Sequence, residues 1–499
     1  MLPFNVMRFS DRLTVVHVAI LLAASFVLIP IPGHTEETPA GIENLIKAQK
    51  WTEVSRALFL EAQRVDPREW SIAVNQAKSG FVDDALASAQ LMHPISRSAL
   101  LLEIVRSAPS LSISRQKEVV QLAWDHAKGN TQSEYHRSGD LTAISLMYVA
   151  WGIEARAQTI YRDALAAAEK GLSEASNGGY RRITEELLRP DVSSLREWMF
   201  EPLLTRVERT PDLFGAVFAY RDLAKIRYRM GKTAEAMNLL NDGVAASNDM
   251  KEGVSKKIAV QALASLAIEM GEIDFAKRHG DQIQLIPEYA LYEAARGNQA
   301  KALALISGVA DTLYVNHRTG TLSRMASDAV RRKDLQSATF YAERLPISWD
   351  EMKAWTQIAE VQAANGDRAS ARASYAKADG ALKKRTGTEY YYADVWATVA
   401  LGESMAQNGF RDDGNQIVAG AIQQVETIPR RRFEDRISAL TLVAPALISI
   451  GKTVEGTTML LEAYREAHDY PESDTMAKLK KAGQLSAIGM AAYHFNHPH

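Results

Sequence analysis

The sequence contains no cysteine, and its positive and negative charges balance almost completely. Its 499 residues include 58 Lys and Arg against 60 Asp and Glu, a formal charge of −2. The missing cysteine excludes disulfide bonds, thiolate zinc sites, iron–sulfur clusters and a cysteine nucleophile. The lack of a basic surplus argues against general nucleic-acid binding, which requires positive potential. An apolar content of 46% is ordinary for a chain that folds around a packed core.

One long apolar run occurs, and it lies near the N-terminus. Residues 13–29 read LTVVHVAILLAASFVLI, preceded by Arg8 and Arg12 and followed by Pro30. A positive segment, an apolar segment and a polar exit with helix breakers are typical of an export signal, which we assign to residues 1–35. The run also suffices for an uncleaved inner-membrane anchor, so cleavage and anchoring both stay open. Either fate predicts a periplasmic or otherwise exported protein, which contacts the membrane only through this run and only if it is not cleaved.

The rest of the chain carries a repeated pattern of apolar and small residues. Past residue 45, apolar residues recur at helical spacing, without a convincing alternating strand pattern. Seven residues before a recurring turn every unit has Ala, Ser or Gly, and five residues after it every unit has Ala or Gly. Six steps over the 220 residues that separate the third and ninth turns average about 37 residues, a period of helical solenoids. The nine turn residues are Gly80, Gly152, Gly231, Gly271, Gly297, Lys333, Gly366, Gly409 and Gly451.

These columns have a physical explanation in two antiparallel helices that pack closely. A glycine suits the left-handed residue that ends the first helix. Small residues in the two columns let the helix backbones approach each other. The pattern therefore predicts a chain of helix pairs. A larger residue nine positions after the turn fills the space beside the contact in four units: Tyr161, Leu240, Tyr375 and Leu460.

At these positions the sequence resembles the tetratricopeptide repeat (TPR) family, in which a small residue in the first helix and a glycine turn precede Ala, an aromatic residue and Ala. The units around Gly152 and Gly366 are the most similar. The family's tryptophan is mostly absent and the spacing varies around the family's 34 residues, so the repeats are TPR-like. The resemblance implies an all-α fold, a right-handed α-solenoid of antiparallel helix hairpins forming a superhelix of about ten to twelve units. It also implies a concave groove lined by the first helices.

Composition shifts divide the chain after the export signal. We expect N-terminal degenerate helical repeats over residues 36–170 and an irregular helical connector over residues 171–212, where prolines and glycines gather. Within the connector, helices are expected near residues 182–188 and 194–209. A TPR-like repeat array follows over residues 213–470. Residues 471–499 are expected to form a C-terminal capping helix and a short disordered tail.

A basic stripe is the first candidate for partner binding. Arg221, Lys225 and Arg229 recur every four residues on one expected helix, beside Phe218 and Tyr228. The resemblance places this helix on the concave groove. Three cations there suit an acidic peptide, a C-terminal carboxylate or an anionic glycan. The simpler interpretation is a solvated helix face.

An aromatic cluster is the second candidate. Tyr390, Tyr391 and Tyr392 precede Trp396, at the junction of two units. Exposed rings there would form a binding anchor or a glycan platform, and we select Tyr391 and Trp396 for this role. Packing between the two units is the alternative.

Patterns that would support catalysis are weak. The Gly-Lys-Thr tripeptides at Gly231 and Gly451 lack the earlier glycine and the strand of a phosphate-binding loop. Glu403 and Ser404 superficially resemble the catalytic pair of lytic transglycosylases, but they lie inside a repeat helix and lack that family's next motif. Histidines in the C-terminal tail lack the supporting groups of a metal site. We therefore expect no catalytic residues, no metal and no cofactor.

Together these features predict a non-enzymatic, exported TPR-like scaffold that binds a protein or peptide partner in a bacterial envelope assembly. An adaptor for polysaccharide or cell-wall machinery, with an anionic glycan as ligand, is the first alternative. A peptidoglycan-active enzyme on a helical superhelix is the second. Nucleic acid is not expected as a partner.

Overall fold

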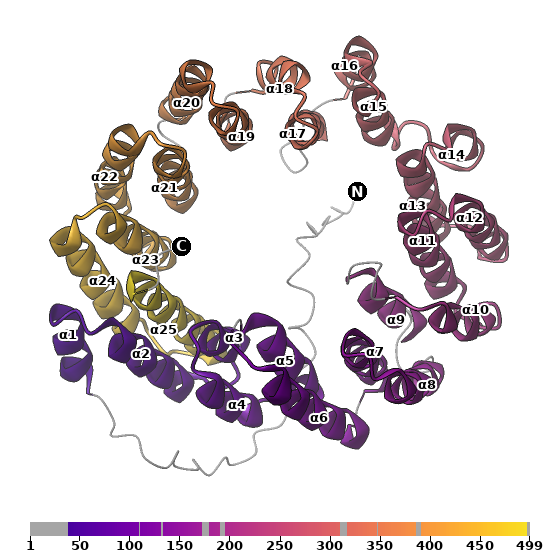
Figure 1. The fold of residues 1–499 in the computed structure, drawn as a ribbon, viewed down its shortest axis with the longest axis horizontal. Coiled ribbons are helices and arrows are strands. Elements are labelled where there is room, and N and C mark those ends of the chain that lie inside the picture. The colour runs from indigo at the N-terminus through magenta and orange to yellow at the C-terminus, as the bar shows by residue number, and fades with distance from the viewer. Residues whose placement is uncertain are drawn as a thin grey trace.

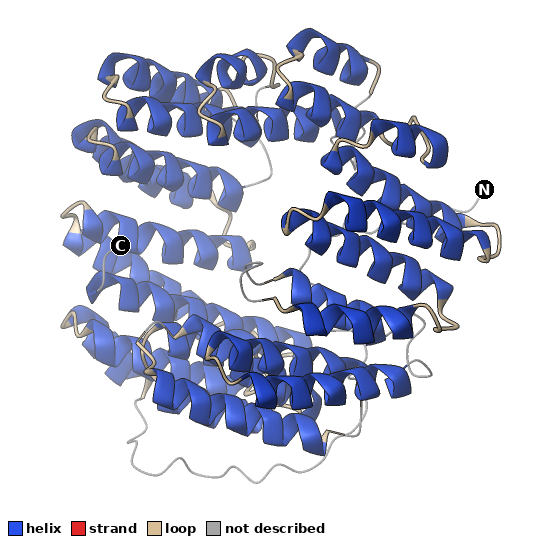
Figure 2. Cartoon of the chain, turned by 45° about the vertical axis from the view of Figure 1, so that its right-hand side comes forward, coloured by secondary structure: helices blue, strands red, loops and turns tan. Residues whose placement is uncertain are grey.

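The computed structural model describes residues 38–108, 110–130, 133–171, 179–189, 195–309, 317–346, 348–385 and 391–496. These residues form 25 α-helices, and none of them lies in a strand (Figure 2). The expected export signal and the last three residues lie outside this description. No helix in the described ranges is long and apolar enough to cross a bilayer.

The helices form a closed ring with two layers (Figure 1). Odd-numbered helices from α3 onward face the inside of the ring, and their even-numbered partners lie outside them. The inner helices are α3 (Trp70–Lys78), α5 (Pro94–Ser107), α7 (Glu134–Ala150), α9 (Gly179–Leu188), α11 (Leu213–Arg229), α13 (Val254–Met270), α15 (Ile286–Ala295), α17 (His317–Arg331), α19 (Trp349–Ala364), α21 (Tyr391–Gln407), α23 (Phe433–Ser449) and α25 (Thr475–Asn496). The outer helices are α4 (Val82–Leu91), α6 (Ile113–Gly129), α8 (Glu154–Lys170), α10 (Phe200–Val207), α12 (Thr233–Asn248), α14 (Ile273–His279), α16 (Gln299–Ser307), α18 (Leu335–Ala342), α20 (Arg368–Lys383), α22 (Arg411–Thr427) and α24 (Thr453–His468), with α1 (Pro39–Lys47) and α2 (Trp51–Val65) beside α24 and α25.

All nine predicted turn residues have a left-handed backbone. Their φ angles lie between 60° at Lys333 and 89° at Gly271. Gly231 shows how the turn is closed: its N–H donates to the carbonyl of Tyr228, and the next N–H donates to that of Arg227, each across 2.9 Å. These two hydrogen bonds provide partners for carbonyls at the C-terminal end of the first helix, which have none within the helix. The predicted turns between paired helices are therefore confirmed.

The two columns of small residues lie at the contact between paired helices, as predicted. Ala224 and Ala236 are fully buried, as are Ala359 and Ala371. The larger residues of the third column are also buried, with exposures of 0 to 1%: Tyr161, Leu240, Tyr375 and Leu460. The two helices of a pair can therefore approach closely, because the side chains between them are no larger than a methyl or hydroxymethyl group.

Two helices of the expected connector lie in the described ranges and take part in the ring. The first helix, α9, packs between α7 and α11 as an inner helix, because Tyr180, Ile183 and Leu187 give it an apolar face. The second helix begins later than expected, after a 3₁₀ turn over Glu197–Met199, and continues as α10. Described parts of this segment thus contribute one inner helix, α9, and one outer helix, α10.

The last helix closes the ring. Helix α25 begins directly after Asp474, whose carboxylate accepts from the N–H of Ala477 across 2.9 Å. It does not cap an open superhelix: it packs on α2 as extensively as paired helices pack elsewhere, and also contacts α3 and α23. No residue from 481 to 495 of α25 is exposed, so neighbours cover this part of the helix on more than one side. The open groove expected from the sequence is replaced by the inside of a ring.

Candidate binding site on the inner wall

Phe218 and Arg221, the first two residues of the predicted basic stripe on α11, contact neighbouring residues of the inner layer. Phe218 is 8% exposed, and the guanidinium carbons of Arg181 and Arg221 lie 5.0 and 4.7 Å from its ring centre. Nε of Arg221 donates to the carboxylate of Asp222 across 2.8 Å. Asp222 is buried, which raises its pKa, and it accepts a second bond from the hydroxyl of Thr184. Phe218 and Arg221 therefore support the surface and are not free to hold a partner.

The second half of the stripe is more accessible. Nζ of Lys225 lies 3.0 Å from the carboxylate of Glu269 on the next inner helix, and both side chains are about half exposed. Arg229 is exposed, and its Nη1 donates to the carbonyl of Leu188 at the end of α9 across 2.8 Å. Tyr228 is half-buried against the core. Lys225 and Arg229 are thus the stripe residues that a partner could reach.

The predicted aromatic cluster divides between the core and the surface. Tyr391 is half-buried, and the guanidinium of Arg432 lies 5.7 Å from its ring centre. Tyr392 and Trp396 are 37% and 45% exposed. Tyr390 lies outside the described residues. The cluster therefore offers one exposed pair, Tyr392 and Trp396, rather than the whole predicted set.

This exposed pair faces the inside of the ring. Tyr392 and Trp396 are one helical turn apart on α21 and share a face. Gly402, on another face of α21, packs against Val418 of the outer helix α22. Since α21 lies on the inner side of α22 in Figure 1, its exposed face turns inward.

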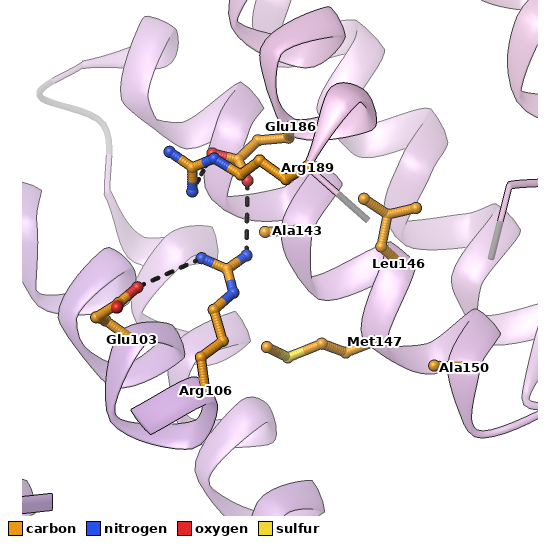
Figure 3. A pocket seen from close by; sticks show the side chains of 8 residues that line it. All are labelled: Glu103, Arg106, Ala143, Leu146, Met147, Ala150, Glu186 and Arg189. Carbon is orange, nitrogen blue, oxygen red and sulfur yellow. Dashed lines mark ion pairs between the residues drawn. The ribbon is translucent and has the colours of Figure 1, made fainter. Parts of the chain in front are cut away.

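A pocket of about 440 Å³ opens between the inner helices α5, α7 and α9 (Figure 3). Two arginines and two carboxylates stand at one side, and small or apolar side chains of α7 form the other. Its volume lies in the range of small-molecule sites. The residues that line it are Glu103, Arg106, Ala143, Leu146, Met147, Ala150, Glu186 and Arg189.

The charged side of the pocket is organised around Glu186. This carboxylate is 3% exposed, and guanidinium nitrogens of Arg106, Arg182 and Arg189 lie 3.5, 3.3 and 3.2 Å from its oxygens. Arg106 also lies 3.7 Å from Glu103. A buried carboxylate requires such partners, because the protein interior solvates charge poorly. Three guanidinium groups thus surround Glu186, while Glu103 pairs with Arg106 and Glu185 pairs with Arg182, so the cluster is close to charge balance.

The apolar side of the pocket comes from one helix. Ala143, Leu146, Met147 and Ala150 follow the spacing i, i+3, i+4, i+7, so they lie on one face of α7. Figure 3 shows the Met147 side chain near the guanidinium of Arg106. The pocket thus combines a charged side, with two arginines and two glutamates, and an apolar side.

A buried carboxyl group lies behind this cluster. Asp140 on α7 is 4% exposed, and its Oδ2 has no hydrogen-bond partner among the described residues. Burial raises the pKa of Asp140 to about 7, with the charge of Glu186 acting in the same direction and Arg182 acting against it. Asp140 therefore loses its proton near neutral pH.

The sequence pattern did not reveal this pocket. Arg106 lies at the end of α5, Glu186 lies on α9 and Arg189 directly follows α9, all outside the columns that define the repeat. One signal was present: Arg182, Glu186 and Arg189 lie on one face of the segment RRITEELLR, opposite Ile183 and Leu187. Nothing in the sequence indicates that α5 would bring Arg106 to the same place.

The other motifs have structural roles. The hydroxyl of Ser404 donates to the carboxylate of Glu360 across 2.7 Å and lies 2.9 Å from the hydroxyl of Tyr375. Gly231 and Gly451 occupy left-handed helix turns. In the described ranges no group of three or more His, Asp or Glu side chains is placed to hold a metal ion.

Comparison with known proteins identifies no family. No protein-family model and no curated protein matches the sequence. Among solved structures, Ton1535 from Thermococcus onnurineus NA1 is 11% identical, over 83% of this chain and 97% of its own, with a TM-score of 0.27. A circular tandem repeat protein with novel repeat topology and enhanced subunit contact surfaces is 12% identical, over 89% of this chain and 98% of its own, with a TM-score of 0.17. TM-scores of this size do not define a shared fold.

Proposed function

We propose that this protein is an exported, non-enzymatic TPR-like scaffold, whose helix pairs stack in the right-handed sense and whose inner wall binds a protein or peptide partner in a bacterial envelope assembly. Residues 1–35 would direct its export. The composition of the inner wall carries the proposal: it exposes the aromatic pair Tyr392 and Trp396 in one part and the cations Lys225 and Arg229 in another.

These two surfaces have the chemistry of partner recognition. Exposed tryptophan and tyrosine provide large contact areas at low cost in conformational entropy, and they dominate many interfaces. Lys225 and Arg229 attract carboxylates, and their weak internal contacts can be exchanged for contacts to a partner. A partner segment with an acidic part and an apolar part would match both surfaces.

The experiment captures partners from envelope extract with the mature chain and compares matched variants. Lys225→Glu with Arg229→Glu reverses the accessible cations and leaves Arg221 beside the buried Asp222, so the fold is not put at risk. Trp396→Ala removes the larger exposed ring. A control reverses three exposed cations of the outer layer: Arg162, Lys277 and Arg278.

We expect the inner-wall variants to lose a specific partner at least tenfold relative to wild type, and the outer-layer control to retain it. Identical partners for wild type and both inner-wall variants would overturn the proposal. Thermal unfolding of each variant verifies that the ring is folded.

A polysaccharide adaptor is the second candidate, favoured by the exposure of Trp396. An exposed indole beside a tyrosine is a suitable stacking surface for sugar rings. Binding of purified envelope glycans by the wild type and its loss in Trp396→Ala, without a captured protein, would favour this function over the first.

A further inference from the structure

None of the residues that line the pocket between α5, α7 and α9 carries the proposed function, although Arg229 reaches the carbonyl of Leu188 next to Arg189. The pocket's two exposed arginines are loosely held. Arg106 is 34% exposed and its carboxylate neighbours lie 3.5 and 3.7 Å away, beyond the 2.7–2.9 Å of a charge-assisted hydrogen bond. Arg189 is 53% exposed, and its one ion pair within the described residues spans 3.2 Å. Several of their N–H donors therefore remain available.

The two guanidinium groups can act on one ligand. They approach different oxygens of the same carboxylate, Arg106 near Oε2 and Arg189 near Oε1 of Glu186, and so lie close to each other. Figure 3 shows an ion pair from each of them to this residue. Arg182 also contacts Glu186, at 3.3 Å, and it pairs with Glu185 as well. A ligand carboxylate would accept from the N–H donors of Arg106 and Arg189 that Glu103 and Glu186 leave without close partners.

The rest of the pocket selects against a fully polar ligand. Leu146 and Met147 provide an apolar surface, and Ala143 and Ala150 leave room above the helix. Methionine is flexible and adapts to different apolar shapes. A small inorganic anion would leave this surface without a partner.

From this arrangement we propose that the pocket binds an apolar carboxylate, whose anionic group contacts Arg106 and Arg189 and whose aliphatic part lies on Leu146 and Met147 of α7. Two sources share this chemistry: a small aliphatic acid, or the free C-terminal residue of a polypeptide with an aliphatic side chain. The proposal does not depend on partner capture by the inner wall.

Titration calorimetry on the full mature chain tests the proposal with octanoate as the probe and octanamide as its uncharged counterpart. Octanoate is expected to bind at least tenfold more tightly than octanamide. Arg106→Gln and Arg189→Gln should each weaken octanoate binding about tenfold, because a bidentate charged contact is lost. Ala150→Trp keeps the arginines but fills the pocket, and it should abolish binding.

Arg331→Gln is the matched control, because this arginine is 76% exposed at the end of another inner helix, α17. It should bind octanoate like wild type. Thermal unfolding identifies any variant that fails to fold. The octanoate affinities of the remaining variants then test the proposal.

Two acetylated hexapeptides ending in leucine, one a free acid and one a C-terminal amide, distinguish the sources. Arginine-dependent binding of the free acid alone supports a polypeptide C-terminus as the ligand, whereas binding of octanoate without either peptide supports a small acid. Equal affinity for octanoate and octanamide, absence of octanoate binding at millimolar concentration, or unchanged octanoate affinity in both folded arginine variants would overturn the proposal. None of these results depends on whether an envelope partner is captured.

Discussion

Arg465 and Glu43 form a two-pronged ion pair between opposite ends of the chain. Nε and Nη2 of Arg465, on α24, donate to the two carboxylate oxygens of Glu43, on α1, across 2.8 and 2.6 Å. These residues are 422 positions apart. The arginine holds the pKa of Glu43 down at about 2, so the pair is charged throughout the physiological range. It marks the place where the ring closes.

We expect this pair to contribute little to the stability of the closure. The Arg465 side chain is 53% exposed and that of Glu43 is 24% exposed, and water screens charges at such positions. A double-mutant cycle with Glu43→Gln and Arg465→Gln should give a coupling energy below about 1 kcal/mol. Urea unfolding of the four proteins measures it. A coupling above about 2 kcal/mol would show that the ion pair, rather than apolar packing, holds the ring closed.

The free energy of unfolding should depend far more on the packing of α25 on α2 than on this ion pair. A Cβ on Gly489 would lie 2.8 Å from Cε1 of Phe59, whose ring is fully buried and cannot move aside. We expect Gly489→Ala to reduce the free energy of unfolding by about 1–3 kcal/mol, as overpacking does. The measurement is again the urea midpoint.

Gly483 provides the control on the same helix. The methyl group of an alanine at this position would have Cδ of Glu69 as its nearest neighbour, 4.0 Å away. Gly483→Ala should therefore raise stability by about 0.5–1 kcal/mol, because alanine favours the helix. Equal effects of the two substitutions would contradict the close packing of α25 on α2.

Replacing Lys333 by glycine should raise the stability of the protein. Lys333 is exposed and has φ of 60°, in the left-handed region, where the other eight repeat turns have glycine. Relief of that strain outweighs the greater freedom of glycine in the unfolded chain, and Lys333→Gly should add about 1 kcal/mol. Gly366→Ala, at φ of 82°, should lose a similar amount. Calorimetric unfolding compares both with wild type, and a destabilised Lys333→Gly would contradict the argument.

Asp140 should make stability depend on pH. Its pKa rises from 3.8 in the unfolded chain to about 7 in the fold, so the folded state holds the proton more tightly. Its contribution is fully present below pH 3.8 and is lost as the pH rises through about 7. Between these values it should lower the free energy of unfolding by about 1.4 kcal/mol per pH unit.

Asp140→Asn removes this titration while nearly preserving the shape of the side chain. Unfolding measured from about pH 4 to about pH 8 should show a flatter profile for the variant than for wild type. Asp83→Asn, at a side chain that is 88% exposed, is the control and should leave the profile unchanged. Parallel profiles for wild type and Asp140→Asn would refute the assignment.

The repeat turns could be located from the sequence because their causes are local. A left-handed residue after a helix favours glycine wherever it occurs, and Lys333 was found by its spacing from the other eight. The stripe on α11 was also correctly placed on an inner helix, but its pairing was not visible. Arg221 is held by the neighbouring Asp222, whereas Arg229 is held by the carbonyl of Leu188 on α9, a helix expected to be part of an irregular connector.

The amino-acid sequence by itself determined that this chain forms helix pairs, because helical spacing, turn residues and small contact residues act over distances shorter than one repeat. Only the tertiary structure decided that the pairs form a ring, because closure depends on the small rotation between successive pairs, accumulated until α25 meets α2. Stacking of the neighbouring helices α5, α7 and α9 likewise brought Arg106 to Glu186, which Arg189 also contacts. No local periodicity in the sequence predicts contacts between residues so distant from each other in the chain.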